Sequence, residues 1–399
     1  MMVLRLFFAI AALSFFVLTR RLPNFVCEMQ LNKLTLLNFK NISEATLEMS
    51  PKINCFLGDN GMGKSNLLDA IYVLSFCKSF SGVPDRMLMK LQCDCAMVKG
   101  EYLRRDAREE VVMGLSAGRR KSFKRGGKEY DRLSSHIGTF PLVMVAPNDV
   151  DLIRGAGEER RKWMDMVISQ GDRRYLDMLI RYNSALEQRN KLLRDGVVDH
   201  NLYMAVEMVM DGAASYLHAR RREWVEKLTV LFGRYYRIIA GEGRETVELR
   251  YEGSLDESPD GSMTALLDGA RRHDEAVKHT SVGPHRDDIA MTLDDMPMRR
   301  TGSQGQCKTF TVALRMAQYE FLREASGVRP LLLLDDIFDK LDAGRVERIM
   351  SLVTSDDFGQ IFITDTNRKH LDEIISRMGS SYRLWNVDDG VFTSDDVTL

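Results

Sequence analysis

The chain has 399 residues, with 56 Lys and Arg against 57 Asp and Glu, which gives a formal net charge of −1 at pH 7. These values are typical of a globular protein of two or three domains. They exclude an overall basic field, so any surface for nucleic acid must come from local patches. The six cysteines form neither a zinc pattern nor a disulfide framework. Free thiols in a reducing cytosol are therefore the preferred interpretation.

The first 18 residues are strongly apolar, and Arg20 and Arg21 follow them. The run is short for a membrane span, and basic residues after it suit a cleaved signal peptide poorly. A second possible start, Met29, is followed at once by a strand pattern. We interpret residues 1–28 as an over-extended gene start, and expect a cytoplasmic protein with no stable membrane association. A membrane tether is the alternative.

Residues 30–57 show the alternation of strands, with a turn near residues 38–41. The last strand, 53–57, leads into a segment that matches G-x-x-x-x-G-K-[ST], and a helix over 66–74 follows. The matching residues are Gly58, Asp59, Asn60, Gly61, Met62, Gly63, Lys64 and Ser65. Glycines let the backbone approach phosphate oxygens, the lysine supplies a point charge, and the serine hydroxyl suits Mg²⁺. The sequence therefore predicts a nucleoside triphosphate site with Mg²⁺.

Short strands are predicted over 96–134, with a further strand at 140–146. Among them lies a basic cluster interleaved with aromatic residues. Its cations are Arg119, Arg120, Lys121, Lys124 and Arg125. Such clusters contact nucleic-acid phosphates, but they are also often solvated faces balanced by nearby acids. Both interpretations stay open, as they do for the basic runs at 173–181 and 220–222.

The pattern becomes helical from residue 158 to about 195 and from 202 to 239, with a turn at 196–199. Residues 254–269 are polar and are predicted to be a loop. The chain then returns to α/β alternation. The elements expected there are a helix over 307–326, a strand at 331–334, a helix over 344–354 and a strand at 360–364.

Two further motifs lie in this last part. Ser303 and its flanking glycines precede a helix, where backbone N–H groups favour an anion. A second anion site is redundant within one subunit, but it makes sense if it meets the γ-phosphate held by a partner. The alternative is a simple helix cap with Ser303 as N-cap. The strand at 331–334 ends in Asp335 and Asp336, which suit Mg²⁺ binding and the orientation or deprotonation of an attacking water.

The order of these motifs resembles the signature, Walker B and D-loop of ABC-type ATPase heads. More specifically, the chain resembles the RecF family from about residue 29 to its end. The segments that carry the likeness are 37–42, 58–66, 146–155, 281–288 and 333–342. The resemblance implies an α/β fold in which an ABC/SMC-type ATPase head, a mixed sheet with helices, is interrupted by a helical arm. We expect head residues at 29–150 and 281–399, and the arm at 151–280.

The resemblance also implies roles for individual residues. Lys64 and Ser65 would hold the triphosphate and Mg²⁺, with Asp335 as the metal carboxylate and Asp336 as the hydrolytic one. Most ABC proteins have Glu at that last position, and the shorter Asp has a different reach. The residues expected to act on a partner's nucleotide are Ser303, Gly305, Gln306 and the D-loop residue Asp342. Thr364-Asp365-Thr366 lies where transporters have a switch histidine, so no histidine receives that role. Asn148 and Asp149 lie near the expected Q-loop.

The function implied is that of a slow, DNA-stimulated ATPase that dimerises on ATP. It would bind double-stranded DNA at gaps or single-strand/double-strand junctions, and help RecO and RecR partners to load the strand-exchange recombinase. An ABC transport subunit is the main alternative, but 156 residues separate strand 140–146 from the signature, far more than in such a head, and the switch histidine is missing. A membrane-tethered ATPase that uses residues 1–18 is another alternative.

Overall fold

The computed structural model describes residues 27–368 apart from 242, 244, 339 and 340, the single residues 372 and 376, and residues 382–395. The apolar N-terminal run therefore lies outside the described residues, and its interpretation stays a prediction. Two residues of the family-like segment 333–342, Asp339 and Lys340, also lie outside the described residues.

A six-stranded sheet forms the centre of the head, in the order β15-β14-β3-β13-β12-β8. All neighbours in it are parallel except the β14–β15 hairpin. Its strands are β3 (Ile53–Leu57), β8 (Leu142–Val145), β12 (Leu331–Asp335), β13 (Ile361–Asp365), β14 (Tyr382–Asp388) and β15 (Val391–Asp395). Every residue of β12 and β13 is buried, which explains their unbroken apolar sequence. Parallel pairing brings the carboxyl ends of β3, β13 and β12 to one edge.

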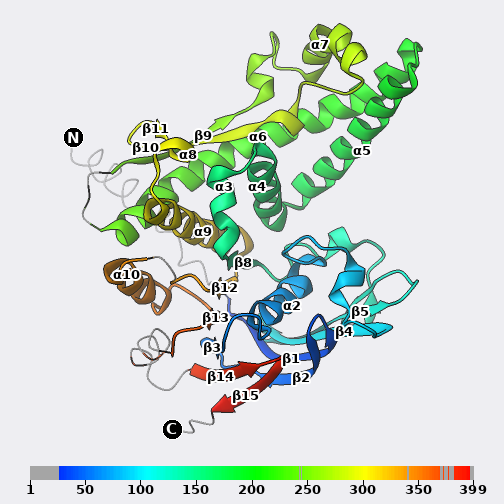
Figure 1. Cartoon of the computed structure of the whole chain (residues 1–399). Coiled ribbons are helices and arrows are strands. Elements are labelled where there is room, and N and C mark those ends of the chain that lie inside the picture. The colour runs from blue at the N-terminus through cyan, green and yellow to red at the C-terminus, as the bar shows by residue number, and fades with distance from the viewer. Residues whose placement is uncertain are drawn as a thin grey trace, which may run out of the picture.

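A second, antiparallel sheet has the order β2-β1-β4-β5-β6-β7. Its strands are β1 (Met29–Phe39), β2 (Ile42–Glu48), β4 (Cys95–Arg104), β5 (Ala107–Ser116), β6 (Ser122–Arg125) and β7 (Lys128–Glu129). The helix α2 (Lys64–Phe76) packs against strands of both sheets. Figure 1 shows α2 beside β4 and β5, and nearly all of its residues are buried.

The arm rises above the head in Figure 1. Its helices are α3 (Asp151–Arg154), α4 (Gly157–Gly171), α5 (Arg173–Asp195), α6 (His200–Ala240) and α7 (Met263–Val277). A small sheet of β9 (Val247–Glu252), β10 (Asp288–Leu293) and β11 (Met296–Pro297) lies along α6, and α8 (Met298–Thr301) follows. This sheet joins strands on both sides of residue 280, where we placed the end of the arm.

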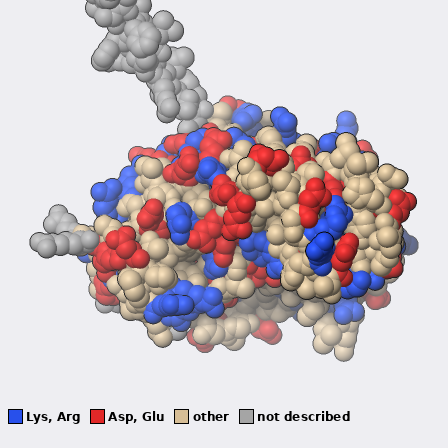
Figure 2. Space-filling view, turned by 90° about the horizontal axis from the view of Figure 1, so that it is seen from above, with Lys and Arg blue, Asp and Glu red and all other residues tan. Residues whose placement is uncertain are grey.

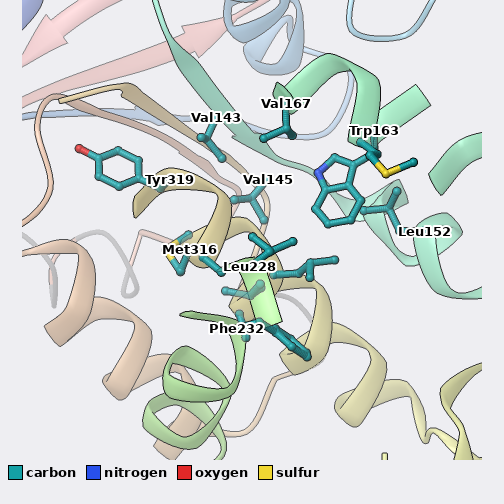
Figure 3. Packing of buried hydrophobic residues seen from close by; sticks show 14 of the residues in the cluster. Val143, Val145, Leu152, Trp163, Val167, Leu228, Phe232, Met316 and Tyr319 are labelled. Carbon is teal, nitrogen blue, oxygen red and sulfur yellow. The ribbon is translucent and has the colours of Figure 1, made fainter. Parts of the chain in front are cut away.

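The helix α9 (Gln304–Ser326) packs between the central sheet and the arm, and α10 (Ala343–Val353) follows β12. Figure 3 shows the shared core, in which Val143 and Val145 of β8 and Met316 of α9 lie close to Leu228 and Phe232 of α6. Head and arm are thus joined by one continuous hydrophobic core, to which α9 contributes.

Several predicted elements are confirmed with small shifts at their ends, including the strands β3, β8, β12 and β13 and the helices α2, α9 and α10. Three predictions were wrong in detail. The helical stretch 158–195 is broken at Asp172, whose side chain accepts a hydrogen bond from the Tyr175 N–H and so starts a new helix. The loop predicted at 254–269 contains the start of α7, which Ser262 caps. The strands β4 and β5 are ten residues each rather than short.

Candidate nucleotide site

The predicted phosphate loop follows β3 directly, and its last two residues, Lys64 and Ser65, are the first two residues of α2. Gly61 and Gly63 have φ values of 84° and 111°, which L side chains rarely adopt. A Cβ at Gly58 would lie 2.3 Å from the Val387 carbonyl oxygen of β14. The glycines are therefore required by the local backbone and by close packing as well as by any ligand.

Lys64 is buried, with 6% of its surface exposed. Its Nζ donates hydrogen bonds to the carbonyl oxygens of Gly58 (2.7 Å) and Asp59 (2.9 Å), so the side chain folds back along the loop. Burial lowers the pKa of Lys64, and the nearby carboxylates of Asp336 and Asp335 oppose that shift. The ammonium group is thus held over the loop where phosphate oxygens would need it.

Ser65 and Asp335 meet although 270 positions separate them in sequence. The Ser65 Oγ donates a hydrogen bond to the Asp335 Oδ1 at 2.9 Å, and Asp335 is 8% exposed. A hydroxyl and a carboxylate at the edge of a phosphate loop are a suitable donor set for Mg²⁺, which also keeps waters and takes substrate oxygens. The described residues contain no cluster of three or more His, Cys, Asp or Glu that could hold a metal alone. These residues therefore fit Mg²⁺ as a companion of the nucleotide.

Asp336 follows β12 directly and lies in the left-handed region, with φ 47°. Its backbone N–H donates to both the carbonyl oxygen and the Oγ1 of Thr364, each at 3.2 Å. This contact holds the second carboxylate residue at the same sheet edge as Lys64, Ser65 and Asp335.

The signature residues form a separate group at the start of α9. Ser303 and Gln306 make a reciprocal capping box, in which the Ser303 Oγ accepts from the Gln306 N–H and the Gln306 Oε1 accepts from the Ser303 N–H. Gln306 Nε2 also donates to Glu245 Oε1 at 2.8 Å. Gly305 faces Arg345, because a Cβ there would lie 2.9 Å from its Nη1. Ser303 therefore caps the helix, which does not conflict with a role toward a partner.

Asp342 lies beside this group as the N-cap of α10. Its Oδ1 accepts from the Arg345 N–H at 3.0 Å, and its Oδ2 pairs with the Arg345 Nε at 3.2 Å. Asp342 is 61% exposed at its side chain. Among the described residues, no hydrogen bond or ion pair joins this group to the phosphate loop. The structure thus brings the predicted site residues together in two clusters rather than one.

Asn148 and Asp149, near the expected Q-loop, lie in a short 3₁₀ helix after β8. Asp149 is buried and accepts hydrogen bonds from Arg315 Nε at 3.0 Å and Nη2 at 2.6 Å. It therefore ties this segment to α9, while Asn148 is exposed.

Sequence reasoning missed the contacts that fix Met62 in the phosphate loop. Its carbonyl oxygen accepts from the Gly390 N–H at 2.8 Å and from the Asn41 Nδ2 at 3.3 Å. Asn41 also accepts from Asn66 of α2. Asp389-Gly390 is a typical hairpin turn between strands, so the turn could have been found, but its position over the loop could not.

The basic cluster at 119–125 divides into two kinds of side chain. Lys121 donates to the Cys77 carbonyl oxygen (2.6 Å) and to Asp85 (2.9 Å), and Arg125 pairs with Glu109. Arg119, Arg120 and Lys124 are exposed, and their side chains make no hydrogen bond or ion pair with the part of the chain that the structure describes. Only these three have free cationic ends.

Most arm cations are also engaged within the chain. Arg221 is 2% exposed and pairs with Asp165 and Asp287, and Arg220 pairs with Asp172. Figure 2 shows Lys and Arg intermingled with Asp and Glu on the arm side of the molecule rather than gathered in one patch. The run at 220–222 is thus mainly structural ion pairs. In the run at 173–181, Arg173 donates hydrogen bonds to Ser135 and Arg174 lies over the Tyr216 ring.

Comparison with known proteins matches residues 30–391 to the family model "RecF/RecN/SMC N terminal domain". The chain is 48% identical over 362 residues to the "DNA replication and repair protein RecF" of Parabacteroides distasonis, which covers 91% of this chain and 98% of that protein. The relative of the same name from Porphyromonas gingivalis is 43% identical over 365 residues, 91% of this chain and 99% of that one. The chain belongs to the RecF family.

Solved structures agree with this assignment. A structure of "the recombination mediator protein RecF-ATPrS in RecFOR pathway" has a TM-score of 0.83 and 27% identity, and covers 93% of this chain and 99% of that one. The Smc head domain from Pyrococcus furiosus has a TM-score of 0.55 at 16% identity, covering 92% of this chain and 96% of that one. The ABC/SMC-type ATPase fold inferred from the motifs is therefore confirmed.

Two compositional expectations can be compared with the structure. All six cysteines are free, and Cys55, Cys77 and Cys307 are buried. Within the described residues, no helix combines the length and the apolar character that a membrane span requires.

Proposed function

We propose that this protein is an ATP-dependent DNA-binding protein of recombinational repair and replication restart, and that its ATP-driven dimerisation is the functional event. The observation that carries the proposal is the division of the site residues into two clusters. Lys64 and Asp335 are buried, and Asp335 accepts a hydrogen bond from Ser65. Ser303 and Asp342 are exposed, and among the described residues no hydrogen bond or ion pair joins them to the phosphate loop. Such a division suits a nucleotide shared between two copies, as the family resemblance implies.

Each residue then has a defined task. The loop from Gly58 to Ser65 binds the triphosphate, and Ser65 with Asp335 holds Mg²⁺, which supplies charge neutralisation at the transferring phosphoryl group. Asp336 orients or deprotonates the attacking water. Ser303, Gly305, Gln306 and Asp342 complete the site of the partner copy. Hydrolysis is slow and DNA-stimulated, and it resets the dimer.

The proposed substrate and partners follow from the relatives. RecF proteins carry the name of DNA replication and repair, and solved relatives are placed in the RecFOR pathway. We infer that this chain acts in the cytoplasm on double-stranded DNA at gaps or single-strand/double-strand junctions. We also infer that it works with RecO-type and RecR-type proteins to load the recombinase.

Dimerisation tests the proposal most directly. We expect the purified protein to be a monomer without nucleotide and with ADP, and a dimer with ATP and Mg²⁺, as measured by light scattering after size exclusion. Asp336→Asn keeps the shape of the side chain but removes its base, so it should trap the ATP-bound dimer. A monomer under all three conditions would contradict the shared-site model.

A second measurement tests the DNA surface. Reversal of Arg119, Arg120 and Lys124 to Glu should weaken duplex binding and reduce the slope of log K against log salt by up to roughly 3, about one for each lost phosphate contact. A matched control reverses Lys162, Lys227 and Arg250, which are exposed but already paired with carboxylates. Equal salt slopes for the two triple variants would exclude a special role for the 119–124 surface.

A further inference from the structure

Thr364 lies near the carboxyl end of β13. It contacts both Asp335, the last residue of β12, and Asp336, which follows that strand. It has 0% of its surface exposed. Its Oγ1 donates a hydrogen bond to Asp335 Oδ1 at 2.6 Å, and the same oxygen accepts from the backbone N–H of Asp336 at 3.2 Å. One hydroxyl therefore contacts both residues of the Walker B pair.

The directions of these two bonds are fixed by chemistry. A backbone N–H can only donate, so the Thr364 oxygen accepts from Asp336. Its single proton is then available for Asp335, whose carboxylate oxygen accepts it. Two hydroxyls, those of Thr364 and Ser65, converge on the same Asp335 Oδ1. Ser65 is itself a proposed metal ligand, whereas the Thr364 hydroxyl is committed to protein groups on both sides.

The bond to Asp336 acts on an unusual backbone. Asp336 has φ 47°, which lies in the left-handed region that is unfavourable for a non-glycine residue. The carbonyl oxygen and Oγ1 of Thr364 both accept from its N–H, which holds this conformation in place. The direction in which the Asp336 carboxylate leaves the strand depends on that conformation.

We propose that Thr364 is a positioning residue for ATP hydrolysis, because its hydroxyl orients the metal carboxylate and the backbone of the hydrolytic residue together. This inference rests on the proposed roles of Asp335 and Asp336. Thr364 is not a catalytic residue, since its hydroxyl bonds only to the protein. Thr364 is the first residue of the segment 364–366, where transporters have a switch histidine. In this chain, residue 364 supplies a buried hydroxyl instead.

Two substitutions separate the hydroxyl from the rest of the side chain. Thr364→Val keeps the volume and removes the donor, and Thr364→Ser keeps the donor and removes a methyl group. We expect the valine variant to lower kcat by about 10- to 100-fold and to raise the Mg²⁺ concentration for half-maximal rate, as is usual when a residue that orients a metal ligand is lost. Binding of ATP in the absence of Mg²⁺ should change by less than about twofold, because Lys64 and the loop are untouched. The serine variant should retain most of the rate.

Thr311→Val is the matched control. Thr311 is also buried, and its hydroxyl donates to a backbone carbonyl within α9, away from both clusters. It should change thermal stability by a similar amount without changing the Mg²⁺ dependence. If the valine variant at 364 does not fold, Thr364→Cys, which keeps a weak donor, carries the test and should give an intermediate rate.

The proposal would be overturned by a Thr364→Val enzyme with wild-type kcat and Mg²⁺ dependence. It would also be overturned by a Thr364→Ser enzyme as slow as the valine variant. If the valine variant does not fold, a Thr364→Cys enzyme with the full wild-type rate would overturn it. Failure of the proposed function looks different. In that case the wild-type protein itself would show no Mg²⁺-dependent hydrolysis above that of Asp336→Asn, and both proposals would fall.

Discussion

The two clusters of the nucleotide site differ in how they are held. In the phosphate-loop cluster, Lys64, Asp335 and Thr364 are at most 8% exposed, and each has partners within the chain. In the signature cluster, Ser303 and Asp342 are exposed, although a capping box engages the Ser303 side chain and Arg345 engages that of Asp342. The phosphate-loop cluster is thus held mainly inside one copy, whereas the signature cluster faces outward and has no hydrogen bond or ion pair to that loop among the described residues. Substitutions in the two halves should therefore fail in different ways.

The largest loss of ATP binding and hydrolysis is expected from a substitution of Lys64. Lys64→Met removes the buried ammonium group, so it should weaken ATP binding and lower hydrolysis by at least about a hundredfold. ATP-dependent dimerisation should be lost with it. Binding of a fluorescent ATP analogue and the sizing experiment measure both. Retention of tight ATP binding would show that the charge is not directed at the phosphates.

Ser303→Arg should disrupt the signature cluster and leave the phosphate-loop cluster intact. The bulky side chain projects from the exposed end of α9, so one copy should still bind ATP while hydrolysis falls by about a hundredfold, because the partner's surface no longer closes the site. Single-site ATP affinity and steady-state turnover distinguish this from the loss at Lys64.

A mixture of the two variants provides the sharpest control. A mixed dimer has one site with an intact loop from the Ser303→Arg copy and an intact signature from the Lys64→Met copy. We expect the mixture to regain hydrolysis above the sum of its parts. A mixture that stays inactive would argue against a site shared in this way.

The phosphate loop and its flanking strand and helix could be predicted from the sequence because their contacts are local. The glycines, Lys64 and Ser65 follow one another, and the apolar runs on either side have the period of their elements. The pair Asp335-Asp336 was recognised for the same reason, since a buried strand precedes it. Parallel pairing of β3, β13 and β12 then makes their approach to Ser65 a consequence of topology.

Contacts between distant segments could not be predicted. Nothing in the residues near Thr364 indicates that its hydroxyl would lie between Asp335 and Asp336, since the register of β13 against β12 decides it. Likewise, Lys121 looks like its neighbours in sequence, but the fold turns it toward Asp85 and the Cys77 carbonyl oxygen. The helix break at Asp172, by contrast, does have a local signal, because Gly171 is a poor helix former and Asp172 is a typical N-cap residue.

A smaller effect is expected from the hairpin turn that fixes the phosphate loop. Gly390 has φ 77°, and a Cβ there would lie 2.9 Å from the Asn41 carbonyl oxygen. Gly390→Ala should push the turn away from Met62 and weaken ATP binding by about tenfold, the size of the strain at such positions. Asp389→Gly changes the same turn without adding a Cβ and should bind ATP normally. Equal affinities for the two variants would remove the turn from the site.

The smallest loss of dimer affinity is expected from a change to Glu245, which supports the signature cluster from the arm side. Glu245 accepts from Gln306 through Oε1 and from the Tyr236 hydroxyl through Oε2, so it links α9 to the long arm helix α6. Glu245→Ala should weaken the ATP-dependent dimer by about fivefold, equivalent to one hydrogen bond of about 1 kcal/mol. ATP binding to one copy should not change, because among the described residues no hydrogen bond or ion pair joins the phosphate loop to Glu245.

The control for this last prediction is Glu248→Ala, which removes the same charge from an exposed position on β9. Its dimer affinity should match that of the wild type, measured by sedimentation over a concentration series with ATP. If both substitutions weaken the dimer equally, the effect is one of net charge rather than of the Gln306 contact. If Glu245→Ala alone does so, the arm contributes to closure by holding the signature helix in position, and the incomplete half of the site depends on the arm for its rigidity.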